Sequence, residues 1–241
     1  MLKHRDHFHG SDLEKIEAIY GIKKEEITSF SANVNPLGIS PMLREQLADK
    51  IDAISSYPDR EYTSLRKCIA EYCGTEYENI IVGNGSTELI SLFIQVQHPK
   101  KTMIIGPTYS EYERSVSLEG GSCLYYPLKE EDDFTLNTEH FLQKLNETID
   151  LLIICNPNNP TGRTAQPELL REIVRKCTEN GVKLVMDECF NDFLTDAERH
   201  TRKDLLESNP GLIILRAYTK MYAVPGVRFG WCMTADAALI E

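Results

Sequence analysis

Several side chains with catalytic potential follow short apolar runs in this chain. Thr219 and Lys220 come shortly after the run at residues 212–215, and Arg228 stands eight residues beyond the lysine, after a Pro-Gly turn. A lysine amine can form a Schiff base with an aldehyde, and an arginine guanidinium can hold a phosphate group. A solvated lysine and a structural arginine would give the same pattern, so other motifs must decide between the two interpretations.

A glycine turn precedes one of the expected helices. Residues 80–82 form an apolar run, two glycines follow, and from Ser86 onward apolar residues recur with the helical period. The free N–H groups of such a helix start can bind phosphate, here from Gly85, Ser86 and Thr87, although an ordinary helix start gives the same pattern. Glu88 occupies the third glycine position of the dinucleotide fingerprint, which argues against the rival nucleotide-binding class.

The order of apolar runs and helical periods predicts an α/β fold. Because strands and helices alternate, we expect a mainly parallel sheet between two helical layers, a three-layer α/β/α arrangement. Strands are expected at 80–82, 101–106, 122–128, 149–155, 182–186 and 212–215, and helices at 12–20, 41–54, 63–72, 111–118, 137–145 and 167–180, with a further helix from 86.

Polar groups near the ends of these strands should converge, since ligands in such sheets bind beyond the carboxyl ends of the strands. Tyr109, Asn159, Asp187 and Lys220 each stand after a predicted strand. With the glycine turn they match the groups of pyridoxal 5′-phosphate: ring, phenolic oxygen, pyridine nitrogen, aldehyde and phosphate. A carboxylate that keeps the ring nitrogen protonated lets the ring accept electrons from a substrate α-carbon.

Charge and composition limit the partners. Lys and Arg total 26 against 37 Asp and Glu, a net charge of −11, which argues against nucleic acid or an anionic membrane and favours a small-molecule substrate. Neither a membrane-spanning run nor a signal peptide is present, so a cytoplasmic location is expected. The seven cysteines include no C-x-x-C pair, so neither a disulfide framework nor a metal site is expected.

The motifs GNGSTE, PTYSEY, CNPNNPTG, MDECF and AYTKMYAVPGVRFG lie between residues 30 and 231. With them the chain resembles the fold-type I pyridoxal-phosphate enzymes of the class I/II aminotransferase family. It is similar to the histidinol-phosphate aminotransferases and more similar to the threonine-phosphate decarboxylases. The resemblance implies that Lys220 forms the Schiff base and moves protons, that Asp187 pairs with the pyridine nitrogen, and that Asn159 binds the phenolic oxygen.

The resemblance also implies the remaining contacts. Tyr109 would stack on the ring, and the phosphate would be bound by Gly85, Ser86, Thr87, Thr219 and Arg228. Tyr57 matches a tyrosine that reaches the cofactor phosphate of a neighbouring subunit, so a homodimer with shared active sites is expected. Residues 1–40 would be an N-terminal arm, and residues 41–241 the cofactor-binding large domain.

Three departures from the aminotransferase pattern bear on the substrate. Phe190 stands where histidinol-phosphate aminotransferases usually have tyrosine, and the decarboxylases tolerate phenylalanine there. His9 and Asn33 match decarboxylase residues that contact the substrate's phosphate. The family's small C-terminal domain, with the arginine that grips the substrate carboxylate, has no counterpart before Glu241. We therefore expect a fragment, a truncated form or a different substrate pocket.

These features lead to three hypotheses about function. The first is a pyridoxal-phosphate-dependent aminotransferase acting on an amino acid or a phosphorylated amino compound. The second is an L-threonine-O-3-phosphate decarboxylase of cobalamin-type biosynthesis, which uses the same cofactor chemistry but breaks a different α-carbon bond. The third is a catalytically inactive remnant that binds the cofactor or a partner.

Overall fold

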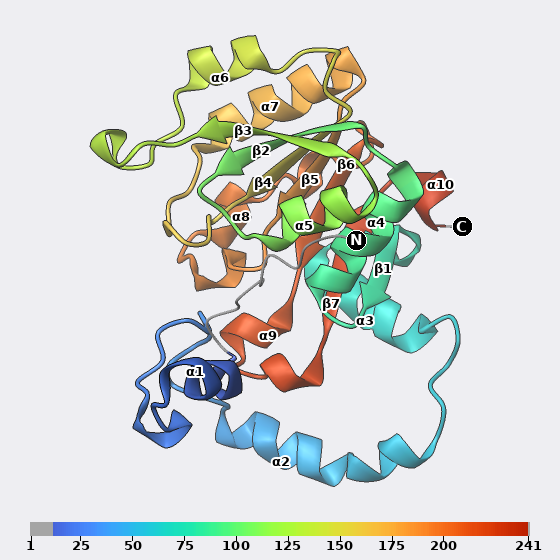
Figure 1. Ribbon diagram of the computed structural model, residues 1–241. Helices are drawn as coiled ribbons and strands as arrows, with labels where there is room; N and C mark the ends of the chain where they lie inside the picture. Colours follow the sequence, from blue (N-terminus) through green and yellow to red (C-terminus); the bar gives the residue numbers. More distant parts are fainter. Residues whose placement is uncertain (1–11, 241) are drawn as a thin grey trace.

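A seven-stranded sheet forms the centre of the computed structural model, which describes residues 12–240 (Figure 1). The strand order is β1-β7-β6-β5-β4-β2-β3. β7 runs antiparallel to both of its neighbours, and all other neighbouring pairs are parallel. The strands are β1 Ile80–Gly83, β2 Lys101–Gly106, β3 Ser122–Pro127, β4 Leu151–Cys155, β5 Lys183–Asp187, β6 Leu212–Arg216 and β7 Gly230–Thr234.

Helices cover both faces of this sheet. The helices of the described residues are α1 Leu13–Tyr20, α2 Pro41–Asp49, α3 Thr63–Cys73, α4 Ser86–Gln97, α5 Glu111–Leu118, α6 Thr138–Lys144, α7 Pro167–Asn180, α8 Ala197–His200, α9 Tyr218–Met221 and α10 Ala237–Ile240. Successive strand residues point to opposite faces, so Leu212 and Ile214 pack with α3, α6 and α7, while Ile213 and Leu215 pack with α4 and α5. The predicted three-layer α/β/α fold with a mainly parallel sheet is confirmed.

Several elements differ from the sequence-based expectation, which included neither α8 nor α9. β7 was not expected, because its sequence GWCMT lacks the Val, Ile and Leu residues that mark β4, β5 and β6, and its pairing depends on strands far away in the sequence. The helix expected over 41–54 ends at Asp49, and a 3-10 helix, Ile51–Ser55, follows. α2 has no buried residue, so no packing surface favours continuing the helix beyond its first turns.

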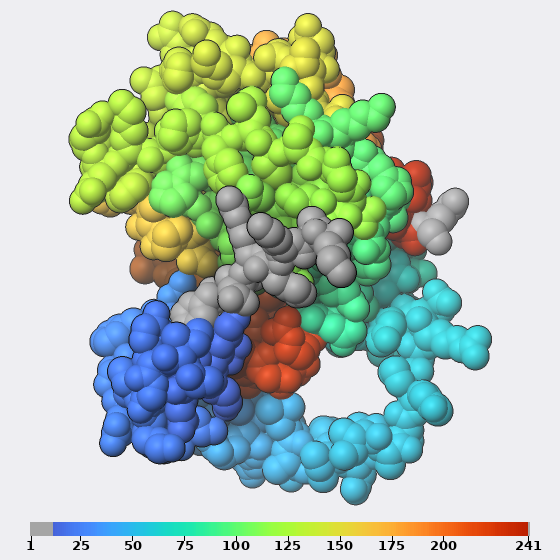
Figure 2. All heavy atoms as spheres, viewed as in Figure 1, coloured from blue at the N-terminus to red at the C-terminus, as the bar shows by residue number. Residues whose placement is uncertain are grey.

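The segment that contains α2 stands apart from the sheet and its helices. Figures 1 and 2 show α2 and the residues after it as an extension below the body of the molecule. Large apolar side chains on this segment are exposed, including Leu37, Met42, Ile54 and Tyr57. No helix among residues 12–240 is long and apolar enough to cross a membrane.

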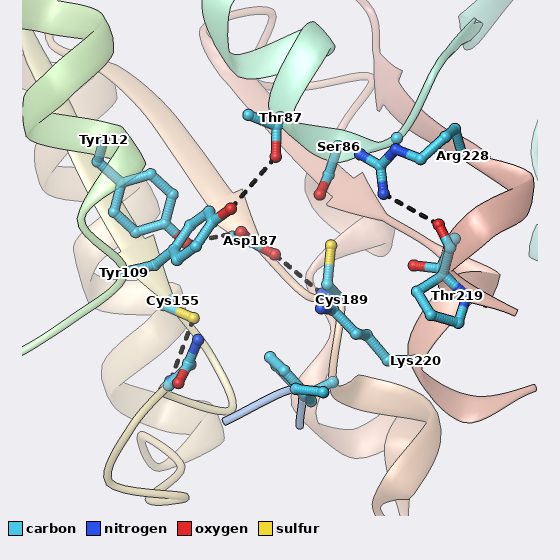
Figure 3. Close-up of a pocket in the computed structure, with 15 residues that line it drawn as sticks. Ser86, Thr87, Tyr109, Tyr112, Cys155, Asp187, Cys189, Thr219, Lys220 and Arg228 are labelled. Atoms are coloured by element: carbon cyan, nitrogen blue, oxygen red, sulfur yellow. Dashed lines mark hydrogen bonds between the residues drawn. The ribbon is translucent and has the colours of Figure 1, made fainter. Parts of the chain in front are cut away.

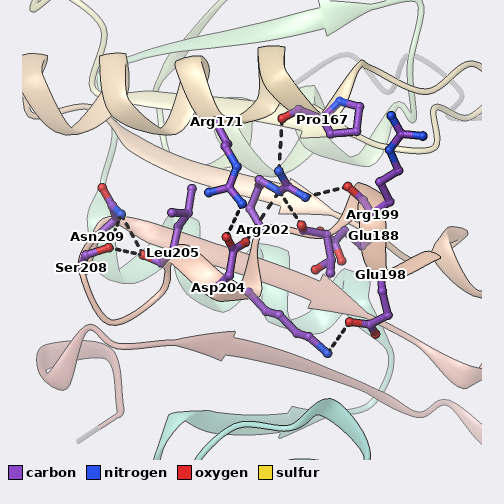
Figure 4. Close-up of polar contacts among 12 residues, drawn as sticks. Pro167, Arg171, Glu188, Glu198, Arg199, Arg202, Asp204, Leu205, Ser208 and Asn209 are labelled. Carbon is purple, nitrogen blue, oxygen red and sulfur yellow. Dashed lines mark hydrogen bonds and ion pairs between the residues drawn. The ribbon is translucent and has the colours of Figure 1, made fainter. Parts of the chain in front are cut away.

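The connection from β5 to β6 is fixed by a buried arginine. Arg202 donates hydrogen bonds to the carbonyl oxygens of Pro167 at 3.2 Å, Arg199 at 2.6 Å and Thr201 (Figure 4). Nearby, the Arg171 guanidinium on α7 donates to an Asp204 carboxylate oxygen at 2.6 Å. These contacts hold the loop that begins at the end of β5 against α7.

Candidate active site

A cavity of about 340 Å³ opens at the carboxyl ends of the parallel strands (Figure 3). The antiparallel β7 contributes to the same edge, because its first residue, Gly230, pairs with Gly83 at the end of β1. This pairing brings Arg228, two residues before β7, to the start of α4. The cavity is lined by Ala32, Gly85, Ser86, Thr87, Tyr109, Tyr112, Cys155, Asn159, Asp187, Cys189, Phe190, Thr219, Lys220, Pro225 and Arg228.

Asp187 is the last residue of β5, and both of its carboxylate oxygens are held. The Tyr112 hydroxyl donates to Oδ2 at 2.6 Å, and the backbone N–H of Cys189 donates to Oδ1 at 3.0 Å. Burial, together with the charge of Asp187, raises the pKa of Tyr112 well above that of an ordinary phenol, so the hydroxyl keeps its proton and stays a donor. The carboxylate is therefore fixed in one orientation at the cavity wall.

Lys220 is presented by α9, a helix of four residues that directly follows β6. All five residues of β6 are buried, so the strand that leads into α9 is held in the core. The Nζ atom of Lys220 lies 6.0 Å from the centre of the Phe190 ring, and the neighbouring Thr219 is buried. Lys220 therefore lines the cavity with the Phe190 ring on one side of its amine.

The start of α4 and Arg228 meet in a corner of the cavity whose groups could bind an anion. Gly85, the residue before α4, has φ +92° and brings no side chain to cap the first N–H groups of the helix. A Cβ atom at Gly85 would lie 2.5 Å from Nη2 of Arg228, and one at Gly230 would lie 2.5 Å from the Ser86 nitrogen. Glycine at these positions therefore lets the guanidinium and β7 approach the positive end of the helix dipole.

Aromatic side chains form a second wall. The Tyr109 and Tyr112 rings meet edge to face, 5.6 Å apart at 85°. The Tyr109 hydroxyl lies 3.4 Å from Oγ1 of Thr87, and burial raises the pKa of the Tyr109 phenol. Tyr109 thus spans the distance from α5 to the start of α4 and offers a ring to a planar ligand.

Asn159 is held between a thiol and a second asparagine. Its backbone N–H donates to Sγ of Cys155 at 3.4 Å, and its Oδ1 accepts a hydrogen bond from Nδ2 of Asn33 at 3.0 Å. Since Oδ1 already accepts a hydrogen bond from Asn33, the Nδ2 group of Asn159 is the part of this amide that can donate a hydrogen bond to an anionic oxygen of a ligand.

The structure gathers most of the residues expected at the site into this one cavity: Gly85, Ser86, Thr87, Tyr109, Asn159, Asp187, Thr219, Lys220 and Arg228. Tyr57 is not among the lining residues, and its side chain is 101% exposed. Asn33 adjoins the cavity through its bond to Asn159, and His9 lies outside the described residues.

Five lining residues were not predicted at the site: Ala32, Tyr112, Cys155, Cys189 and Pro225. Tyr112 stands three residues after Tyr109, a spacing that places both on one side of a helix start and could have revealed it. Burial raises the pKa of Cys155 to about 12 and that of Cys189 well above its usual range. Both therefore remain neutral thiols, which line the cavity as small, weakly polar groups.

The donor set fits pyridoxal 5′-phosphate. The glycine cradle at Gly85, the facing guanidinium of Arg228 and the helix N-terminus suit a phosphate, while the buried carboxylate of Asp187 suits a pyridinium nitrogen. The fold and these groups define the large domain of a fold-type I pyridoxal-phosphate enzyme.

The chain belongs to the family called aminotransferase class I and II, whose model matches residues 25–241. It is 34% identical over 230 residues to the threonine-phosphate decarboxylase of Salmonella typhimurium, covering 95% of this chain and 62% of that protein. This chain therefore spans less than two thirds of that relative.

Solved structures agree in fold. The histidinol-phosphate aminotransferase of Clostridium acetobutylicum matches with a TM-score of 0.79 at 31% identity, over 89% of this chain and 62% of that one. The histidinol-phosphate aminotransferase of Sinorhizobium meliloti, solved in complex with pyridoxal-5′-phosphate, matches with a TM-score of 0.77 at 22% identity, over 86% and 56% of the two chains. Pyridoxal 5′-phosphate is thus the cofactor that family and cavity both indicate.

Proposed function

We propose that this chain is the cofactor-binding part of a pyridoxal-phosphate-dependent aminotransferase that acts on a small amino compound. One observation carries the proposal: Lys220, Asp187 and the corner formed by Arg228 and the start of α4 line a single cavity. An amine, a buried carboxylate and an anion site at one place are the groups that this cofactor requires.

When bound, pyridoxal 5′-phosphate supplies an aldehyde that reacts with amines and a ring that accepts an electron pair from the substrate's α-carbon. Lys220 would hold the cofactor covalently and, once released, carry a proton to or from the α-carbon. Asp187, kept in place by Tyr112, would keep a proton on the ring nitrogen. Arg228 and the N–H groups of Ser86 and Thr87 would hold the phosphate.

Two further side chains would orient the pyridine ring of the cofactor. Tyr109 would stack on one ring face, and Nδ2 of Asn159 would donate to the phenolic oxygen. Asp187 and Thr219 are buried at the cavity wall, which strengthens the contacts that they would make. Residues of this chain would therefore contact the ring nitrogen, the phenolic oxygen, one ring face and the phosphate of the cofactor.

Decarboxylation of threonine phosphate is a second candidate activity. Phe190 lines the cavity and brings an apolar ring, where a tyrosine would bring a hydroxyl. The likeness to the decarboxylase from Salmonella typhimurium supports the same candidate.

Product analysis separates the candidates. The chain loaded with cofactor is incubated with threonine phosphate, or with an amino donor and a keto acid, and carbon dioxide and new keto acid are measured. Amino transfer supports the first proposal, and carbon dioxide from threonine phosphate supports the second. Binding of the cofactor without either product would make the chain an inactive remnant. Turnover that persists in Lys220→Ala would refute both activities.

We further propose that two copies of the chain assemble with shared active sites. Leu37, Ile54 and Tyr57, which flank α2 in the sequence, are exposed. Exposed apolar groups on one segment are typical of a surface covered by another protein. Sedimentation of the chain tests this: a dimer that Tyr57→Ala leaves intact, but with weaker cofactor binding, supports sharing, whereas a monomer at all concentrations contradicts it.

A further inference from the structure

The segment at residues 32–35, far from the rest of the site in the sequence, crosses the cavity edge. Ala32 lines the cavity, and Asn33 and Asn35 both bond to residues expected to handle the cofactor. We infer that this segment, termed the asparagine clamp, positions Lys220 and Asn159. The inference rests on the proposed function, in which these two residues contact the cofactor.

Asn35 uses all of its polar groups. Its backbone N–H donates to the carbonyl oxygen of Lys220 at 2.9 Å, and its Nδ2 donates to the carbonyl oxygen of Met221 at 3.0 Å. Its Oδ1 accepts from the N–H of Leu37 at 3.0 Å, and its carbonyl oxygen accepts from the N–H of Gly38 at 3.1 Å. The local turn therefore keeps Asn35 rigid while its two donors bind the lysine segment.

These bonds matter because α9 is short. The N–H groups of Tyr222, Val224 and Ala223 bond to the carbonyl oxygens of Tyr218, Thr219 and Lys220, the last at 3.3 Å. Asn35 completes this cap: it adds a shorter bond at the Lys220 carbonyl and supplies the bond at the Met221 carbonyl. The cap fixes the backbone from which the Lys220 side chain starts, and a small displacement there moves the amine away from a reactive carbon.

Asn33 acts on the other side of the cavity. Its Nδ2 donates to Oδ1 of Asn159 at 3.0 Å, which fixes the orientation of the Asn159 amide and leaves Nδ2 of Asn159 as the donor. The asparagine clamp thus contacts both Asn159 and the Lys220 segment from one short stretch of sequence.

Two ligands separate positioning from folding. Pyridoxal phosphate can attach to Lys220, whereas pyridoxamine phosphate lacks the aldehyde and binds only through the ring and phosphate contacts. Asn35→Asp keeps the acceptor for Leu37 but loses the donor to Met221. We expect it to lower borohydride-trapped labelling of Lys220 roughly five- to tenfold at a fixed, subsaturating concentration, while pyridoxamine phosphate affinity changes less than about twofold.

Asn146→Asp is the matched control. Asn146 makes the same pattern of bonds, accepting from the N–H of Thr148 at 3.0 Å and donating to the carbonyl oxygen of Lys144 at 3.1 Å, on a turn away from the cavity. It should leave both ligands unaffected. If Asn35→Asp does not fold, Asn35→Ser serves, because its hydroxyl retains a local acceptor but is too short to reach Met221.

The outcomes are distinct. Equal losses for the two ligands, or unchanged labelling, would overturn the positioning role of Asn35. Selective loss of labelling supports it. If the unsubstituted chain binds neither ligand, the proposed function fails, and the clamp has no cofactor residues to position.

Discussion

Tyr112→Phe tests how the buried carboxylate of Asp187 is held. The hydroxyl lies 2.6 Å from Oδ2, Tyr112 is 0% exposed and Asp187 is 5% exposed. Oδ2 accepts this hydrogen bond at a position largely removed from solvent. Removing one partner of a buried bond to a charged group costs about 1.5–3 kcal/mol. With a urea m-value of about 3 kcal/mol/M for a chain of this size, the midpoint of unfolding should fall by roughly 0.5–1 M.

Tyr125→Phe is the matched control for this measurement. The Tyr125 hydroxyl also donates to a carboxylate, Oε2 of Glu113 at 3.0 Å, but its side chain is 42% exposed. Water can replace that bond, so the midpoint should move by less than about 0.2 M. Equal shifts in the two variants, or no shift for Tyr112→Phe, would refute the claim that the buried hydroxyl stabilises Asp187.

Two further substitutions test the corner formed by Arg228 and the start of α4, and the buried ion pair between Arg216 and Glu188. Gly85→Ala places a methyl group 2.5 Å from a guanidinium nitrogen, so pyridoxal phosphate affinity should fall roughly tenfold or more in equilibrium dialysis; Gly120→Ala, also at positive φ but with open space, should leave affinity unchanged. Arg216→Met removes the ion pair, 2.7 Å long, to the buried Glu188 and should cost about 3–5 kcal/mol of unfolding free energy. Burial raises the pKa of Glu188, and the charge of Arg216 lowers it. The folded chain therefore binds this proton more tightly than the unfolded chain, and the unfolding free energy falls as the pH rises above the unfolded value of 4.5. The fall should be steeper in Arg216→Met, up to about 1.4 kcal/mol per pH unit, and a parallel pH dependence in urea titrations would contradict this.

The sequence was sufficient for those parts of the site that depend on strand ends. Lys220, Asp187 and Asn159 each follow a run of buried apolar residues, and parallel strands necessarily bring such positions to one edge. That is why the predicted sheet and most of the predicted lining agree with the structure.

The remaining features depend on distant contacts that no local pattern encodes. β7 reverses direction between β1 and β6, which explains how Arg228 reaches the start of α4. The bonds of Asn33 and Asn35 span more than a hundred residues of sequence. Tyr57 requires a second subunit to be assigned, so its role stays a prediction.

The central claim is that Lys220 is the point of cofactor attachment. The chain is mixed with pyridoxal phosphate, reduced with borohydride and mapped by peptide mass spectrometry, with Lys220→Ala as control. The account predicts one dominant label, on Lys220, which disappears in the variant. Label spread over surface lysines, with no preference for Lys220, would contradict it.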